Sequence, residues 1–275
     1  FPDADPQSWG INFMRNIRRK NEQVFWAPIP RAFSLTRVSL AGSLRDLESL
    51  DRGLDLRVTP FVTGGGRRTL DEGATENSTQ SDIGLDVKYG LTASLNLDVT
   101  INTDFAQAEV DNEQVNLTRF PLFFPEKRDF FLENSGQFTV GTPNSNRRLA
   151  DLFFSRRIGL TASGANLPIL GGARLTGKVG RNNIAIMDIQ TDADAGQPGE
   201  NFLVARYSRD VLGRSQIGGI VINKQANSGG HFNRTYAADM NLALTRAFTV
   251  DGFIAGTSTP GVTEGEVGGH LRAGY

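Results

Sequence analysis

The sequence predicts an all-β protein, an antiparallel transmembrane β-barrel of the bacterial outer membrane, either complete or partial. Three observations lead to this prediction. Apolar and polar residues alternate with a period of two in many segments. The predicted strands are about 8–13 residues long, close to the roughly 9–11 residues that a tilted strand needs to cross a bilayer. The connections alternate between short turns and longer polar loops, as they do in outer-membrane barrels.

The clearest strands are predicted at 82–91, 95–105 and 234–245. In the last of these, Leu242 and Asp239 fall on opposite faces, and we expect the leucine to face outward and the aspartate inward. A soluble sandwich or a lipocalin-like barrel would show the same alternation, so the alternation alone does not decide between the classes. Noisier strands are predicted at 51–63, 167–179, 184–191, 201–210, 216–225, 248–257 and 267–275.

The connections favour the membrane class. A barrel in the outer membrane has short turns on its periplasmic rim and long loops outside, whereas a sandwich has no reason to sort its loops in this way. The short turns are predicted at 92–94, 180–183, 211–215 and 246–247. The longer loops are predicted at 64–81, 192–200, 226–233 and 258–266.

The composition agrees with this class and excludes others. The chain has 275 residues, 39% of them hydrophobic, a net charge of −1 and no cysteine. No run of apolar residues is long enough for a transmembrane helix, but alternating strands keep the average composition polar. The charge argues against a nucleic-acid partner, and the missing thiols exclude disulfides and thiolate metal sites. We expect no cofactor, and an export signal would precede Phe1.

The alternation breaks between residues 106 and 151, where Phe, Pro and charged residues concentrate. We predict an excursion at about 106–127, folded either into the lumen or outside with a small core of its own. The short turns 92–94 and 180–183 should lie on the same side of the membrane, so the chain between 106 and 166 must cross the membrane an even number of times. The segments 128–140 and 152–160 are therefore either both wall strands or neither is. We favour both, which gives twelve crossings rather than ten. The candidate plug residues of the excursion are Arg119, Phe123, Phe124, Glu126, Lys127 and Arg128.

Charged residues on the polar faces of the strands should face the lumen, because an Arg or Lys facing lipid at the bilayer centre costs about 2–4 kcal/mol. They could form a selectivity lining or a salt-bridged filling. We favour the filling slightly, because both signs are mixed. The predicted lumen-facing residues are Asp86, Asp98, Arg174, Lys178, Arg206, Asp239, Asp251 and Arg272.

Four stretches resemble one group of bacterial outer-membrane proteins: WGINFMRNIRRKNEQVFWAP (9–28), NTDFAQAEVDNEQVNLTRFPLFFPEKRDFFLEN (102–134), LFFSRRIGL (152–160) and PILGGARLTGKVG (168–180). Those proteins join an N-terminal domain similar to family-nine carbohydrate-binding modules to a C-terminal β-barrel domain of unknown function. The resemblance implies that residues 1–33 are the tail of the periplasmic module or a linker. It also implies that 34–275 form the barrel domain, either complete or incomplete at its C-terminal end. It implies no established activity.

The sequence gives little support for catalysis or for a metal site. His231 lies in a predicted loop near Ser228, and His270 lies on a strand, so the histidine on which barrel hydrolases depend has no evident partner set. We therefore expect no catalytic residue. A weak calcium candidate comprises Asp192, Asp194 and Glu200, but its spacing departs from the EF-hand loop, and a polar external loop is favoured over any metal site.

Three functions follow from these features, in decreasing order of support. The first is a pore or docking channel for small solutes, saccharides among them. The second is a structural or interaction barrel with a plugged lumen, which anchors a periplasmic domain or binds a protein partner at the periplasmic or external rim. The third, an outer-membrane hydrolase, has the weakest support. The expected partners are outer-membrane lipid, a small solute or saccharide, and a protein at one rim.

Overall fold

The computed structural model describes residues 6–29, 35, 40–48, 50, 54–71, 74–103, 126–141, 151–160, 167–193, 196–213, 215–245 and 248–274. Contacts divide the chain into two compact units, Phe1–Leu54 and Asp55–Tyr275. Each unit is treated by itself below. Among the described residues, no helix has the length and apolar content needed to cross a membrane.

The first unit contains two small antiparallel pairs. Strand β1 (Gln7–Ile11) pairs with β4 (Gly42–Leu47), and β2 (Met14–Ile17) pairs with β3 (Glu22–Phe25) across the 3₁₀ turn η1 (Arg18–Lys20). The sequence prediction placed the domain boundary at residues 33–34. The contacts place it between residues 54 and 55, because β4 completes a ladder with β1.

The second unit is built on one antiparallel sheet of ten strands. Their order in the sheet follows the chain from β5 to β14, with sequential neighbours paired throughout. The strands are β5 (Leu56–Asp71), β6 (Ala74–Thr92), β7 (Leu95–Thr103), β8 (Ile169–Val179), β9 (Asn182–Thr191), β10 (Glu200–Val211), β11 (Ser215–Ala226), β12 (Phe232–Ala243), β13 (Thr249–Ser258) and β14 (Val267–Gly274).

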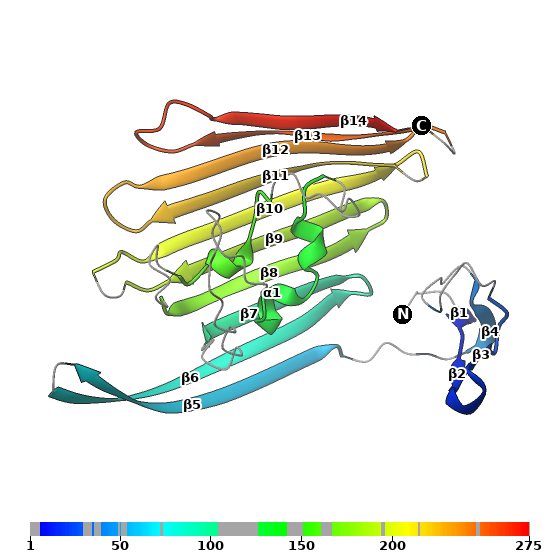
Figure 1. Ribbon diagram of the computed structural model, residues 1–275, viewed down its shortest axis with the longest axis horizontal. Coiled ribbons are helices and arrows are strands. Elements are labelled where there is room, and N and C mark those ends of the chain that lie inside the picture. Colours follow the sequence, from blue (N-terminus) through cyan, green and yellow to red (C-terminus); the bar gives the residue numbers. More distant parts are fainter. Residues whose placement is uncertain are drawn as a thin grey trace. The chain divides into compact units, whose positions relative to one another are not determined.

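Each of the ten predicted strands is present, and the all-β antiparallel class is confirmed (Figure 1). The sheet is not closed into a barrel, because β5 and β14 form its two ends and are not paired with each other. Because consecutive strands are antiparallel neighbours, the turns after β6, β8, β10 and β12 lie at one end of the strands, and the longer connections after β7, β9, β11 and β13 lie at the other. The connection between β5 and β6 also lies at this second end but is short, because their ladder extends from Asp71 to Ala74.

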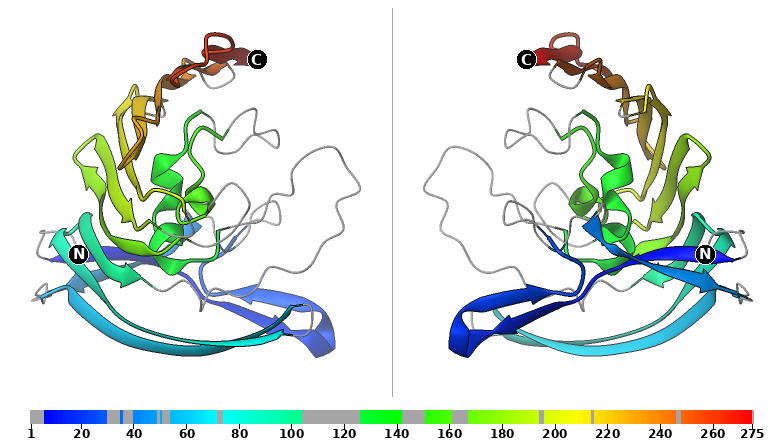
Figure 2. Two further views of the ribbon diagram at one scale, coloured as in Figure 1. Left: turned by 90° about the vertical axis from the view of Figure 1, so that its left-hand side faces the viewer. Right: turned by 90° about the vertical axis from the view of Figure 1, so that its right-hand side faces the viewer.

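The sheet curves, so it has a concave and a convex face (Figure 2). The two-residue alternation sorts the side chains between these faces. Asp239 lies on the concave face, where it binds Arg206 of β10, and Leu242 of the same regular strand faces the opposite way. Apolar side chains dominate the convex face, and polar and apolar side chains share the concave one.

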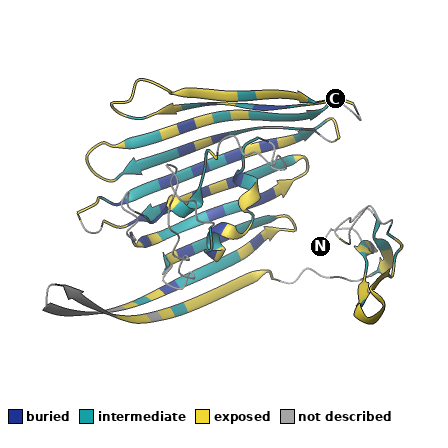
Figure 3. Cartoon of the chain, viewed as in Figure 1, coloured by how far each residue is buried: buried dark blue, intermediate teal, exposed yellow. Residues whose placement is uncertain are grey.

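Part of the concave face is covered by two stretches, 126–141 and 151–160, which we call the inward segment (Figure 2). It contains the short helix α1 (Asp129–Leu132) and the 3₁₀ turns η3 (Ser135–Phe138) and η4 (Ser155–Arg157). Its buried side chains Phe131, Phe138 and Ile158 form the core together with concave-facing residues of β8 to β11. Burial is therefore concentrated in the middle of the sheet, and the edge strands remain exposed (Figure 3).

Two predictions about the connections are wrong. The stretch 64–81, read as a loop because of its Gly, Ser and Thr, continues the β5–β6 ladder without a register shift as far as Asp71 and Ala74. Threonine is compatible with strands, and the neighbouring strand supplies the backbone partners. The stretches 128–140 and 152–160 are not wall strands but short helical turns, so the sheet has ten strands and not twelve. The requirement that both or neither belong to the wall is met.

Candidate functional site

The contact between the inward segment and the concave face contains a polar network that centres on Arg174. This side chain of β8 is 1% exposed. Its Nη2 lies 2.8 Å from Oδ2 of Asp98 on the neighbouring strand β7. Its Nη1 donates to the backbone carbonyls of Phe130 and Glu133, at the end of α1. Carbonyls at a helix end lack intrahelical partners, and a cation there is favourable.

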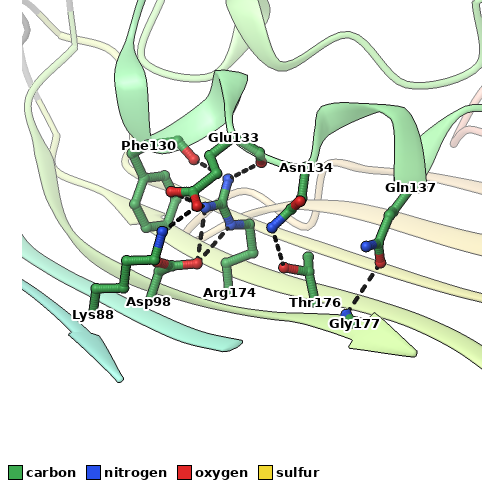
Figure 4. A network of polar contacts seen from close by, with 9 residues as sticks. All are labelled: Lys88, Asp98, Phe130, Glu133, Asn134, Gln137, Arg174, Thr176 and Gly177. Carbon is green, nitrogen blue, oxygen red and sulfur yellow. Dashed lines mark hydrogen bonds and ion pairs between the residues drawn. The ribbon is translucent and has the colours of Figure 1, made fainter. Parts of the chain in front are cut away.

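Further contacts extend this network on both sides (Figure 4). Lys88 of β6 forms an ion pair with the Glu133 carboxylate. The Asn134 side-chain amide donates to the Thr176 hydroxyl at 3.2 Å, and the backbone N–H of Gly177 donates to the Gln137 side chain at 3.1 Å. The network therefore joins the inward segment to three neighbouring strands, β6, β7 and β8.

A second cluster holds the two stretches of the inward segment together. The Arg128 guanidinium bonds to the Glu126 carboxylate, with an Nε to Oε1 distance of 2.7 Å. It also donates to the backbone carbonyls of Ser155 and Ile158, at 2.6 and 2.7 Å, and it lies over the Phe131 ring. The Ser155 hydroxyl donates back to Glu126 at 2.7 Å. Arg128 thus connects residues of 126–141 with residues of 151–160.

The environment of Glu126 shifts its acidity. Burial disfavours the charged carboxylate, but the hydrogen bonds and positive charge of Arg128, together with the Ser155 hydroxyl, outweigh it. The pKa of Glu126 therefore lies below its ordinary value of 4.5. The carboxylate is ionised at neutral pH, so this cluster contains a complete ion pair.

All eight charged residues that the sequence placed on one face lie on the concave face, and six of them pair with one another. Asp98 pairs with Arg174. The other two pairs are Arg206 with Asp239 at 2.8 Å and Arg272 with Asp251 at 2.9 Å.

The two remaining predicted residues have other partners. Asp86 accepts a hydrogen bond from the Thr100 hydroxyl at 2.6 Å, and Lys178 pairs with Asp210. Each of the four positive charges in this set is thus paired with a carboxylate.

The other candidates contribute less. Arg119, Phe123 and Phe124 lie outside the described residues, while Glu126 and Arg128 form the cluster above, with Lys127 between them.

The calcium candidate is not assembled in the described part of the chain. Asp192 accepts a hydrogen bond from the neighbouring Ala193 N–H, Glu200 pairs with Lys224, and Asp194 lies outside the described residues. His231 is exposed in the β11–β12 connection, and His270 lies on β14 beside the Phe253 ring.

Sequence reasoning missed Lys88, Glu133, Asn134 and Gln137 as site residues. Lys88 could have been found, because it lies on the polar face of a predicted strand together with Asp86. The other three could not, since their stretch was assigned to a wall strand and their positions depend on how α1 and η3 fold.

The fold and the site define a class: an open antiparallel sheet with an apolar convex face and an ion-paired concave face, on which an internal segment packs. In comparison with known families, residues 53–172 match a family model described as a domain of unknown function (DUF5916). The match begins just before β5 and ends within β8, so it includes the inward segment. No curated protein and no solved structure matches the chain.

Proposed function

We propose that the second unit is part of the wall of an outer-membrane β-barrel, with its convex face toward lipid, and that the inward segment fills the interior. In this proposal the protein is a plugged scaffold that anchors a periplasmic domain or binds a partner at one rim, and it is not an open pore. One observation carries the proposal: the same sheet has an apolar exposed face and an ion-paired covered face.

The convex face supports a lipid environment. Large apolar side chains remain exposed there, for example Ile83 at 70% and Leu271 at 69%. Extended exposed apolar surface on a soluble monomer is unusual and marks a membrane or partner contact. Among the described convex side chains of β6 to β14, the charged ones are Asp188, Arg209 and Arg234, and each lies within four residues of a strand end. That distribution matches an apolar band bordered by polar rims.

The concave face supports the plugged alternative. A pore that selects by charge needs charged groups that remain accessible to a solute. Here the guanidinium groups of Arg174 and Arg206 are 1% and 5% exposed and are bound to carboxylates. The inward segment adds apolar contacts over β8 to β11, which supports a filled interior in this part of the face.

Current across a planar bilayer tests the proposal. We expect the inserted protein to give no stable open channel. Arg174→Met removes the side chain that links the inward segment to Asp98, so we expect this variant to give more frequent channel openings. A steady conductance in the unaltered protein would show that the interior is open and would favour the pore.

A second function, docking of a small solute, is supported by a cavity of about 330 Å³ between the inward segment and the sheet. Aromatic residues Phe138 and Phe153 line it together with Ser155 and Arg174. Calorimetric titration with a panel of saccharides tests this function. Heat of binding that disappears on widening the site by Phe153→Ala would support it.

A further inference from the structure

The cavity of about 330 Å³ lies where the inward segment meets the middle of the sheet. Its lining from the sheet comprises Arg174 of β8 and Met187 of β9, each 1% exposed. The rest of the lining comes from the two stretches of the inward segment. The contacts of Arg128 and Arg174 fix both stretches, so the cavity is preformed, as small-molecule sites usually are.

More than half of the lining residues are large and apolar. Phe131, Phe138, Phe153 and Phe154 line the cavity from the inward segment, and Met187 lines it from the sheet. The Phe138 and Phe153 rings have centroids 5.7 Å apart and are tilted by 52°, so they present surfaces of different orientation. A further ring beside them gains edge-to-face or offset contacts, and a methionine sulfur also contacts rings favourably. The lining therefore favours an aromatic ligand.

The charged side chains of the lining are already engaged. The Glu126 carboxylate accepts hydrogen bonds from the Arg128 guanidinium and from the Ser155 hydroxyl. The Arg174 guanidinium bonds to a carboxylate of β7 and to two carbonyls of the inward segment. Asp151 is exposed to water. None of these groups needs a charge from a ligand, so the cavity favours a neutral one.

Two hydroxyl groups of the lining remain available. Ser135 lies in η3 and Thr139 directly follows it, and both line the cavity. In the part of the chain that the structure describes, neither hydroxyl has a hydrogen-bond partner. A hydroxyl donates one hydrogen bond and accepts up to two, so this pair satisfies one or two polar groups of a ligand.

Two hydroxyls are too few for a saccharide. A monosaccharide carries several hydroxyl groups, and each one that is buried without a partner costs free energy. An aromatic ring has no such cost and gains from burial. An apolar cavity of about 150 Å³ lined by Leu, Ile and Phe binds benzene. At about twice that volume, the cavity under the inward segment accommodates one ring with small substituents.

We infer that this cavity binds a small neutral phenol, whose ring contacts the Phe138, Phe153 and Met187 side chains and whose hydroxyl bonds to Ser135 or Thr139. The inference rests on the docking function proposed above, and it replaces the saccharide of that function by an aromatic class of ligand. It requires neither an open lumen nor a closed wall, since every group that carries it belongs to the inward segment, β8 or β9.

The methionine methyl groups provide a direct test, because the chain has only three methionines. Met187 lines the cavity, Met14 lies in the first unit, and Met240 lies on the convex face of β12. The methyl signals of isotope-labelled protein in lipid nanodiscs are recorded by NMR while p-cresol is added. We expect the ring current of the bound ligand to shift the Met187 signal until the shift saturates. Met187→Leu assigns that signal, and the Met14 signal is the internal control.

The Met240 signal distinguishes binding from dissolution in the lipid. In the proposed function this residue faces lipid, so p-cresol that merely dissolves there would shift the Met240 signal without saturation. A Met187 shift that follows the Met240 shift at every concentration would overturn the inference.

A variant without the two hydroxyls tests the polar contact. Ser135→Ala combined with Thr139→Val removes both hydroxyls and nearly keeps the volume of the side chains. We expect this double variant to weaken p-cresol binding about 2- to 10-fold, the effect of losing one hydrogen bond between neutral groups, and to leave toluene binding unchanged. Thr257→Val on β13, at a residue that does not line the cavity, is the matched control and should leave both affinities unchanged.

Two further probes separate failure of the inference from failure of the docking function. Saturable binding of methyl glucoside as tight as that of p-cresol would leave the docking function standing and overturn the phenol class. Cyclohexanol that competes as well as p-cresol would also overturn that class, as would equal p-cresol binding by the double variant and the unaltered protein. No saturable binding of any of these probes would overturn the docking function and the inference together. Whether the interior is plugged is measured separately, by the bilayer current.

Discussion

At the scale of single residues, the inward segment depends on two arginines that differ in what they join. Arg174 binds the inward segment to the sheet, through Asp98 and the carbonyls at the end of α1. Arg128 binds the two stretches of the inward segment to each other. Both guanidinium groups use their planar fork to contact several acceptors at once, which a lysine could not do.

Replacing Arg174 should be strongly destabilising. Arg174→Met leaves Asp98 buried without its cation, and loss of one member of a buried pair costs about 3–5 kcal/mol. We expect a reduction of this order in the free energy of unfolding in urea, together with faster tryptic cleavage within the inward segment. Lys178→Met is the matched control. Its pair with Asp210 has side chains 49% and 32% exposed, and such pairs contribute at most about 1 kcal/mol. Equal effects of the two variants would contradict the assigned role.

Acid should loosen the second cluster. Because the pKa of Glu126 is lowered in the folded protein, its contribution is fully present above the ordinary value of 4.5 and is lost as pH falls through the lowered pKa. We expect the protection of the amides in 151–160 against hydrogen exchange, relative to their intrinsic rates at each pH, to decrease below pH 4.5. Glu126→Gln should show that reduced protection already at neutral pH and should lose the dependence on acid. A pH profile that is the same in both proteins would assign the acid effect to another group.

At the scale of elements, an ion pair on the concave face depends on a glycine in the strand that lies between its two members. Gly218 of β11 lies between Arg206 of β10 and Asp239 of β12, and its missing side chain lets the ion pair bridge across the intervening strand. A Cβ at this position would lie 2.8 Å from the Ser208 Cβ and 3.1 Å from the Asp239 Oδ1.

Gly218→Ala should therefore disturb this pair. Overpacking of this kind costs about 1–3 kcal/mol, and we expect a decrease of that size in the free energy of unfolding. Gly268→Ala on β14 is the matched control, because no atom lies within 4 Å of the added Cβ. Its effect should stay within about 0.5 kcal/mol. A neutral Gly218→Ala would mean that the pair adjusts without cost.

At the scale of the whole second unit, the environment of the convex face decides between a membrane wall and a soluble sheet. Val221 lies near the middle of β11 on that face and is 40% exposed. In water, a substitution at such a site changes stability by about 0.5 kcal/mol or less. In lipid, an arginine near the bilayer centre costs about 2–4 kcal/mol.

Val221→Arg should accordingly reduce the free energy of unfolding measured in lipid vesicles by about 2–4 kcal/mol. Gln225→Arg, four residues nearer the rim on the same face, should cost less because the penalty decreases toward the interface. Equal and small effects of both substitutions would argue against contact between this face and lipid.

The sequence by itself determined the ten strands and the face on which the eight charged residues lie. Both follow from the two-residue period, which is a local property of each strand, and cross-strand pairing preserves it. Asp98 and Arg174 could therefore be assigned to one face without knowing that they would bond to each other.

Only the tertiary structure decided the state of 126–141 and 151–160, the extension of the β5–β6 hairpin and the partner of each charge. The stretch 128–140 is apolar enough for a strand, but its Phe131 and Phe138 are buried against β8 to β11, a contact that no local pattern encodes. Residues 64–71 and 74–81 pair because their strands are held together elsewhere along the same ladder. Tertiary contacts override local preference at both places, since a neighbouring surface supplies the burial or the hydrogen bonds that the segment alone lacks.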